Sequence, residues 1–153
     1  MKKYIYTVIL VTAFASCNQK SDTEESTPSK NYLDQYNDEN KLKELSIKII
    51  STGDTIAFQQ MSDIYWISGH RHEFLYYAIR IANDYQYHDG YYEAYSILHT
   101  DIKTNTNKKT NDLANYYLLK AYELGNKSAK RNLKNRFPKE QPSSEEYWQT
   151  INH

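Results

Sequence analysis

The stretch YYLLKAYELGNKSAKRNL, residues 116–133, decides the fold class because it places apolar side chains at helical spacing on both sides of a Gly-Asn pair. Before the pair, Tyr117 begins an apolar series with intervals of three and four residues, and after it Ala129 and Leu133 are four residues apart. Such intervals put side chains on one face of a helix. A glycine just past a helix supplies a left-handed C-cap, and a following Asn can cap the next helix. The stretch therefore predicts two helices joined by a tight turn at Gly125.

The same spacing recurs twice upstream, as a glycine, an alanine four residues later, and a Met or Leu four residues after that. The three copies are Gly53-Ala57-Met61, Gly90-Ala94-Leu98 and Gly125-Ala129-Leu133. Their glycines are separated by 37 and 35 residues, and a fixed period in the mid-thirties is typical of stacked helix pairs. We expect each glycine to turn the chain within a pair and each alanine to let the helices approach closely. The alternative is helical amphipathicity that arose by chance, without stacking.

The composition also favours a helical chain. The 153 residues include four Gly and three Pro, too few for a turn-rich all-β fold, and 39% are apolar, too many for a wholly disordered chain. Helical periodicity runs from about Tyr36 to Phe137, and the strict alternation typical of strands is absent. The sequence therefore predicts an all-α fold, a short solenoid of about three antiparallel helix pairs over residues 34–137. A polar loop is expected from Lys103 to Asn111.

Residues 116–133 resemble the Sel-like branch of the tetratricopeptide-like repeat superfamily, through the run Tyr-Tyr-Leu-Leu-Lys-Ala-Tyr-Glu-Leu-Gly-Asn and the later Ala129 and Leu133. The resemblance covers about residues 42–137 and is best in the last unit. The middle unit carries extra residues around 85–88, and the usual glycine-rich loop after it is replaced by a polar one. The resemblance implies a helix-pair solenoid in which the first helix of each pair lines a concave, ligand-facing surface.

Residues 138–153 are expected to cap the open end of the repeats. Ser143 or Ser144 can cap a short helix, in which Trp148 and Ile151 would pack over the last pair. A terminal repeat needs such a cover because its outer face has no neighbour.

The first seventeen residues resemble a bacterial lipoprotein signal. A basic Lys2-Lys3 pair precedes an apolar run over residues 4–14 that is too short to span a bilayer, and two small residues stand directly before Cys17. The resemblance implies that residues 1–16 are a signal peptide and that Cys17, the only cysteine of the chain, carries the lipid. An ordinary secretory signal with a chance cysteine is the alternative.

Residues 17–33 are interpreted as the lipidated cysteine and a flexible acidic tether, since Ser, Thr and Glu dominate and few apolar residues occur. The lipoprotein resemblance implies the cell envelope of a gram-negative bacterium. The expected location is the outer membrane, either on its periplasmic side or exposed at the surface, with the membrane contacted through the N-terminal lipid.

Several function classes are disfavoured by composition and motifs. Nineteen basic against nineteen acidic residues argue against a general nucleic-acid binder, and a single cysteine excludes an intramolecular disulfide framework. His70-Arg71-His72-Glu73 is the densest group of metal-ligating types, but histidines two residues apart do not share a helix face. No phosphate-binding loop or nucleophile elbow occurs in the sequence. We therefore expect no enzyme, no cofactor and no metal site.

Sixteen tyrosines are the main indication of a partner surface. Tyrosine offers apolar area and a hydroxyl at a small entropic cost and is enriched at protein interfaces. Within the first helices of two pairs, tyrosine doublets are followed by a basic residue, four positions after the first tyrosine. The candidate partner-binding residues are Tyr76, Tyr77, Arg80, Tyr116, Tyr117 and Lys120. Tyrosines that merely pack between helix pairs are the alternative.

These observations favour a membrane-anchored helical-repeat protein that binds a protein or peptide partner in the cell envelope. A second hypothesis is an immunity protein that neutralises a secreted toxin, since a small repeat scaffold with a lipoprotein signal suits that role. A metal-dependent envelope enzyme using the histidine group near residue 70 is a weaker third.

Overall fold

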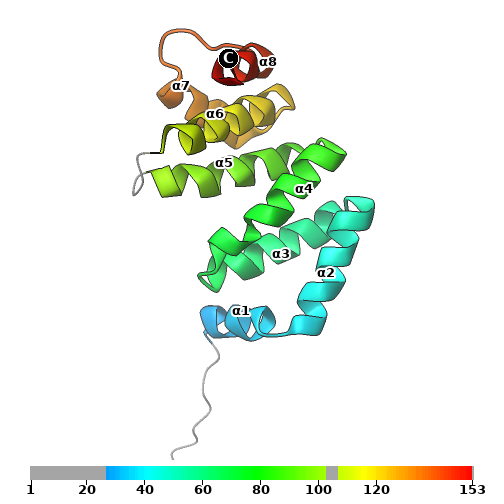
Figure 1. Ribbon diagram of the computed structural model, residues 1–153. Helices are drawn as coiled ribbons and strands as arrows, with labels where there is room; N and C mark the ends of the chain where they lie inside the picture. Colours follow the sequence, from blue (N-terminus) through cyan, green and yellow to red (C-terminus); the bar gives the residue numbers. More distant parts are fainter. Residues whose placement is uncertain (1–26, 103–106, 153) are drawn as a thin grey trace, which may run out of the picture.

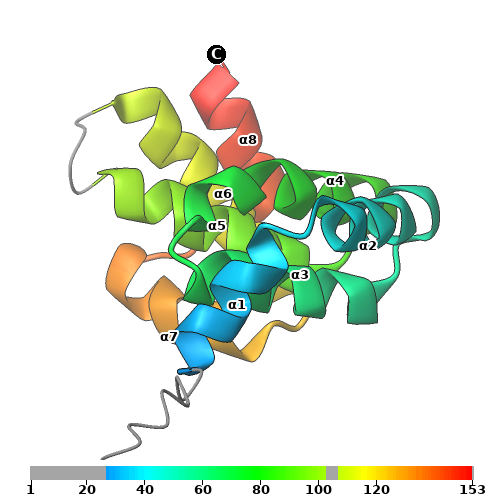
Figure 2. The ribbon, with the colours of Figure 1, turned by 90° about the horizontal axis from the view of Figure 1, so that it is seen from below.

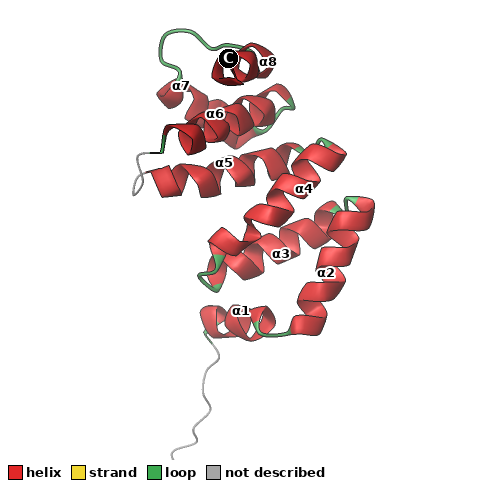
Figure 3. Ribbon diagram, in the orientation of Figure 1, coloured by secondary structure: helices red, strands yellow, loops and turns green. Residues whose placement is uncertain are grey.

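Every regular element in the described part of the chain is a helix (Figure 3). The structure is a computed structural model that describes residues 27–102 and 107–152. In chain order the elements are α1 (Pro28–Tyr36), α2 (Glu39–Thr52), α3 (Thr55–Ile67), the 3₁₀ helix η1 (Arg71–Phe74), α4 (Leu75–Tyr85), α5 (His88–Ile102), α6 (Lys108–Glu123), α7 (Lys127–Arg136) and α8 (Ser144–Asn152). No strand occurs within these residues, so the all-α prediction is confirmed.

Helices that are neighbours in the chain pack against each other as pairs, α2 with α3, α4 with α5, and α6 with α7. Figure 1 shows the helices following one another from α1 at one end of the molecule to α8 at the other, and Figure 2 shows them from below. The most extensive contact joins α5 to α6, which belong to successive pairs. At the two ends, α1 packs on α3 and α8 packs on α6.

Two of the predicted glycine turns have the expected backbone. Gly53 ends α2 in the left-handed region at φ 65°, and Asp54 caps α3 by accepting hydrogen bonds from two backbone N–H groups at 2.9 and 3.0 Å. Gly125 has φ 92°, and the Asn126 side chain accepts from the backbone N–H of Ala129 at 2.8 Å. Side chains other than glycine are strained at such φ values, which explains the residue type at both turns.

The prediction that Gly90 turns the chain is wrong. Gly90 is the third residue of α5, and the left-handed residue after α4 is Gln86, at φ 53°. A Cβ on Gly90 would lie 2.5 Å from Cγ2 of Ile81 and 2.9 Å from the backbone nitrogen of Ala82. The absence of a side chain at Gly90 therefore allows α4 and α5 to approach closely, and it does not serve the turn.

The core is built from small residues at helix crossings and larger ones between them. Ala57, Ala94 and Ala129, in the second helix of each pair, are all buried. Phe58 and Phe74 are also buried and lie 5.1 Å apart between ring centroids. Close packing of this kind fixes the direction of each helix relative to its neighbours.

Helix α1 begins inside the range predicted to be a tether. The predicted tether extends over residues 17–33, but the helix starts at Pro28, with Thr27 as its N-cap. Proline suits the first position of a helix because its missing N–H would have no intrahelical partner there. Tyr36 at the end of α1 meets the Tyr65 ring of α3 edge-on at 5.4 Å between centroids. Tyr36, together with Tyr32, packs against the core and anchors this largely polar helix.

Helix α6 likewise begins inside the predicted polar loop. The predicted loop extends to Asn111, but α6 starts at Lys108. Asn107 caps the helix by accepting a hydrogen bond from the backbone N–H of Lys109 at 3.0 Å. Polar residues of a type common in loops therefore serve here as a helix cap and first turn.

The predicted signal peptide, residues 1–16, and Cys17 lie outside the described residues. Within residues 27–102 and 107–152, no helix combines the length and the apolar content required to cross a bilayer.

Candidate functional site

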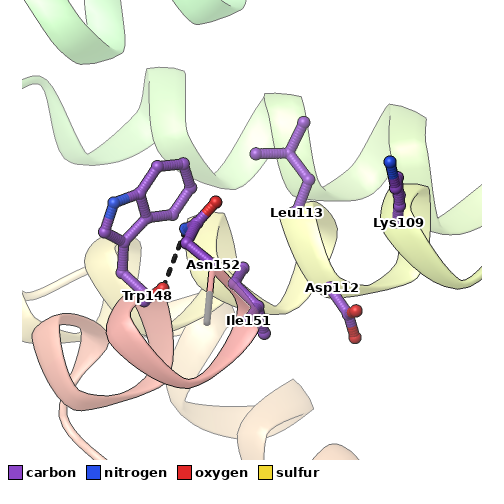
Figure 4. A pocket seen from close by; sticks show the side chains of 6 residues that line it. All are labelled: Lys109, Asp112, Leu113, Trp148, Ile151 and Asn152. Carbon is purple, nitrogen blue, oxygen red and sulfur yellow. Dashed lines mark hydrogen bonds between the residues drawn. The ribbon is translucent and has the colours of Figure 1, made fainter.

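A groove of about 430 Å³ lies between α6 and α8. Its lining residues are Lys109, Asp112, Leu113, Trp148, Ile151 and Asn152. Figure 4 shows the side chains of Lys109, Leu113, Asn152 and Trp148 directed to one side of the two helices, while the Asp112 carboxylate is directed to the other. The groove therefore presents an ammonium group, an aliphatic side chain, an amide and an indole in a row.

On the α6 side of the groove, residues at helical spacing form a stripe along one face of the helix. Lys109, Leu113, Tyr116 and Lys120 follow one another at intervals of four, three and four residues, so they share one face of α6. This stripe joins two of the predicted partner-binding residues, Tyr116 and Lys120, to two residues that line the groove.

The α8 side is held in place by a capping box. The backbone N–H of Glu146 donates to Oγ of Ser143 at 3.2 Å, and the backbone N–H of Ser143 donates to the Glu146 carboxylate at 2.9 Å. This reciprocal arrangement satisfies two N–H groups at the helix start. The bonds from Ser143 also hold the pKa of the Glu146 carboxyl below its usual value.

A second contact fixes α8 to the end of α6. The Ser144 side chain is buried, and its backbone N–H and Oγ–H both donate to the Glu123 carboxylate, at 2.6 and 2.5 Å. Tyr147 adds a bond to the middle of α6, where Nδ2 of Asn115 donates to its hydroxyl at 2.9 Å. The two walls of the groove are therefore tied together at several points.

Trp148 and Tyr116 form the aromatic part of the site. Their ring centroids lie 4.7 Å apart with planes at 48°, and Trp148 stays 40% exposed. Burial is the main cause that raises the pKa of the Tyr116 hydroxyl, with nearby tyrosines and the carboxylates of Glu145 and Glu123 adding to the effect. Among the described residues no hydrogen-bond partner is found for Nε1 of Trp148, so the indole edge is available to a ligand.

The charges around the groove are only partly balanced. Asp112 accepts from Nζ of Lys108 at 2.8 Å and from the Tyr147 hydroxyl at 3.3 Å, and its bond to Lys108 raises the pKa of that lysine. The side chains of Lys109 and Lys120 make no hydrogen bond or ion pair within the described residues. An exposed ammonium group, unpaired within this part of the chain, therefore stands at the Lys109 end of the groove.

The predicted residues of α4 contact one another. Tyr76 is 53% exposed and meets the half-buried Tyr77 ring at 5.3 Å. Arg80 binds the Asp84 carboxylate at 2.7 Å, and its guanidinium lies 3.5 Å from the Tyr76 hydroxyl. No ring contact joins Tyr76 to Tyr116 among the described residues. The structure thus places the six predicted residues in two groups, one on α4 and one on α6.

Tyr117, another of the predicted residues, belongs to the core. Its side chain is buried, its ring lies 5.8 Å from that of Tyr91, and burial raises the pKa of its hydroxyl. The Asn83 side chain lies at hydrogen-bonding distance, 3.5 Å, from the same hydroxyl. Tyr117 therefore joins α6 to α4 and α5 and presents no surface to a partner.

The histidine group near residue 70 is used in contacts between helices. The His70 ring stacks on Tyr36 at 3.7 Å, and Nδ1 of His70 lies 3.1 Å from the Ser68 hydroxyl. Glu73 accepts from the Tyr36 hydroxyl at 2.7 Å. In the part of the chain that the structure describes, no group of three or more His, Cys, Asp or Glu side chains is placed to hold a metal ion.

None of the six residues that line the groove is among the partner-binding residues predicted from the sequence, so sequence reasoning missed this site. The helical spacing from Lys109 to Lys120 is the signal that could have revealed the α6 wall of the groove. The polar residues up to Asn111 instead favour the prediction of a loop. The sequence predicts that Trp148 packs over the last pair as part of a cap; its ring lies against Tyr116 of α6, and the residue also lines the groove and stays 40% exposed.

Comparison of the chain with known protein families, with curated proteins and with solved structures finds no match.

Proposed function

We propose that the chain is a helical-repeat protein whose groove between α6 and α8 binds a protein or peptide partner. The observation that carries this proposal is the exposed indole of Trp148, packed on Tyr116 between two helices that are firmly tied together. Tryptophan and tyrosine in such positions commonly dominate the binding energy of protein interfaces. A groove with rigid walls also lowers the entropic cost of binding, because little has to be ordered when the partner arrives.

The repeat architecture that we propose is the tetratricopeptide-like solenoid, and hydrogen bonds between successive units support it. The Tyr85 hydroxyl donates to the backbone oxygen of Ile50 at 2.8 Å, across 35 residues. Nδ2 of Asn126 donates to the Asp89 carboxylate at 2.7 Å, across 37 residues. These separations match the sequence period, as expected when each unit contacts mainly the next.

The proposal includes a lipid anchor at Cys17. The basic pair, short apolar run and small residues before this cysteine support it. In Figure 1 the described chain begins at α1, at the opposite end from α8, so a tether entering there would attach at the end of the molecule remote from the groove. Radiolabelled palmitate should be incorporated into the natural chain and not into Cys17→Ala, and a Cys17→Ala variant that remained membrane-bound would contradict the anchor.

The binding function can be tested by site-specific crosslinking in the native envelope. A photoreactive phenylalanine analogue at position 148 should give a partner adduct, identified by mass spectrometry. The same analogue at position 66 is a matched control, because Trp66 is 39% exposed and Trp148 is 40% exposed. Equal adducts from both positions, or none from position 148, would contradict a binding site in the groove.

The tyrosines of α4 and α6 form a second testable part of the proposal. Tyr76→Ala combined with Tyr116→Ala should weaken capture of the partner, and each single variant shows which helix contributes. Far-ultraviolet circular dichroism checks that helicity is retained. If Tyr76→Ala alone has no effect, the binding surface is confined to the groove and does not extend to α4.

A further inference from the structure

We infer that the groove between α6 and α8 takes a short partner segment with acidic residues at one end and an apolar side chain a few residues away. In the complex, the carboxylates of the partner lie beside Lys109, and its apolar side chain lies over Leu113 and Trp148. This inference rests on the proposed function, since it specifies the chemistry of the partner that the groove would bind.

The charge at one end of the groove carries the first half of the inference. Lys109 is exposed and unpaired among the described residues, and its side chain is directed along the same side as the apolar row in Figure 4. The one carboxylate among the lining residues, that of Asp112, is bonded to Lys108 and Tyr147 and is directed away. A ligand carboxylate would therefore meet an uncompensated cation at this end.

The middle of the groove carries the second half. Leu113 and Ile151 are half-buried, and the Trp148 ring packs on Tyr116 with part of its surface open. Burying an aliphatic or aromatic side chain of a partner here would remove apolar surface from water on both sides of the contact. The Nε1–H of Trp148 can donate to a backbone carbonyl of the same segment.

The far end of the groove fixes the direction of the segment. Near Tyr116 lie the carboxylates of Glu123 and Glu145, both of which raise the pKa of the tyrosine hydroxyl through their charges. Lys120 is the single basic residue of the α6 stripe at that end, so the local formal charge is negative. Carboxylates of a ligand are therefore favoured beside Lys109 and disfavoured beside Tyr116.

Helix geometry sets the spacing between the two features of the segment. Lys109 and Tyr116, the residue on which the Trp148 ring packs, are seven residues apart on α6, which corresponds to about 10 Å along the helix axis at a rise of about 1.5 Å per residue. An extended peptide covers that distance in about three residues. The expected ligand therefore has an acidic residue and, about three positions away, a Phe or Leu.

Fluorescein-labelled seven-residue peptides provide the probe. One peptide carries Asp-Glu followed by two glycines and a Phe, a second replaces Asp-Glu by Lys-Lys, and a third replaces the Phe by Gly. Fluorescence anisotropy with the full-length chain should show the first peptide binding about tenfold more tightly than either of the others, a difference of about 1.4 kcal/mol. Equal affinity for the acidic and the basic peptide would overturn the inference.

Two variants show where the peptide binds. Lys109→Glu should remove the preference for the acidic peptide, whereas Lys134→Glu, on an exposed lysine of α7, is the matched control and should leave the preference unchanged. Leu113→Gln should weaken the acidic peptide while circular dichroism shows retained helicity. A preference that is insensitive to Lys109→Glu places the site elsewhere and overturns the inference.

Nuclear magnetic resonance gives a readout within the same sample. The indole N–H signal of Trp148 should shift on addition of the acidic peptide, while that of Trp66 serves as the internal reference. Absence of binding by every peptide, together with a partner adduct from position 148, would overturn this inference and leave the proposed function intact. Absence of both would overturn the two together.

Discussion

The two tryptophans of the chain are almost equally exposed, at 39% for Trp66 and 40% for Trp148, yet their surroundings differ. Nε1–H of Trp66 donates to the Glu93 carboxylate at 2.9 Å, and the Arg71 guanidinium lies 3.9 Å above the ring centroid. Arg71 also donates to the backbone oxygen of Ser96. The exposed part of Trp66 is therefore engaged in a network that joins α3, η1 and α5.

Trp148 has no comparable polar network within the described residues. Its ring packs on Tyr116, and no hydrogen-bond partner for its Nε1 is found in that part of the chain. The exposed fraction alone therefore does not mark a binding residue. A tryptophan is available to a partner when the indole N–H and the ring faces have no contacts within the protein. A group that already has such a contact must lose it before it can bind a partner.

The largest effect on stability is expected at Gly90, in α5, a helix that lies between the two tryptophans in the chain. Gly90→Val would force α4 and α5 apart, because a Cβ would lie 2.9 Å from the backbone nitrogen of Ala82. We expect the free energy of unfolding to fall by about 3 kcal/mol, as for an overpacked core position. Urea unfolding monitored by circular dichroism measures the change.

Gly69→Ala is the control for this variant. Gly69 has φ 87°, but a Cβ at this position would meet no described atom within 4 Å, so only backbone strain of about 1 kcal/mol is expected. Equal losses at Gly90 and Gly69 would show that backbone conformation, and not the close approach of α4 to α5, makes Gly90 necessary.

The comparison of the tryptophans predicts unequal effects on stability. Trp66→Ala removes the hydrogen bond to Glu93 and the stacking of Arg71, so a loss of about 2 kcal/mol is expected. Trp148→Ala removes one aromatic contact at an exposed position, and a loss of about 1 kcal/mol is expected. Urea unfolding measures both losses of stability. A larger loss for Trp148→Ala would contradict our assignment of Trp66 as the structural residue and Trp148 as the binding residue.

Ser144→Ala tests whether the walls of the groove are held together by the contact with Glu123. The variant loses the 2.5 Å bond from the serine hydroxyl while keeping the backbone N–H bond, so a loss of about 1 kcal/mol is expected. Hydrogen exchange should accelerate in α8 and remain unchanged in α3. Uniform acceleration in both helices would show that α8 does not open on its own.

The smallest effect concerns the carboxyl that holds Trp66. Burial is the main cause that raises the pKa of Glu93, against the lowering effects of Trp66 and Arg71. A carboxyl with a raised pKa in the folded state costs stability once pH rises from the unfolded pKa through the folded one, because ionisation is harder in the folded protein. Glu93→Gln should therefore be slightly more stable than the natural chain at pH 7.

The gain from Glu93→Gln should vanish at a pH below the pKa of an unfolded glutamate, where both states of the natural chain carry a neutral carboxyl. Thermal unfolding from pH 3 to pH 8 measures this. A gain that is independent of pH would mean that packing, and not ionisation, distinguishes the two side chains.

Much of the helical pattern could be predicted from the sequence because it depends on local chemistry. The Gly-Asn pair at Gly125 combines a residue that tolerates positive φ with one that caps a helix, and the structure uses both. Gly90 has the same sequence spacing but a different role, since contact with α4 is a tertiary property that spacing cannot report.

The helical character of the chain follows from its sequence, because the apolar period and the caps act within single helices and turns. Which aromatic residues are available to a partner depends on how the helices pack in three dimensions. Tyr117 is buried, Tyr116 packs against Trp148, and Trp66 is engaged by Glu93 and Arg71. The physical reason is that exposure and free hydrogen-bonding capacity depend on which helices meet, and the groove is formed by α6 and α8, whose contact is separated in the chain by all of α7.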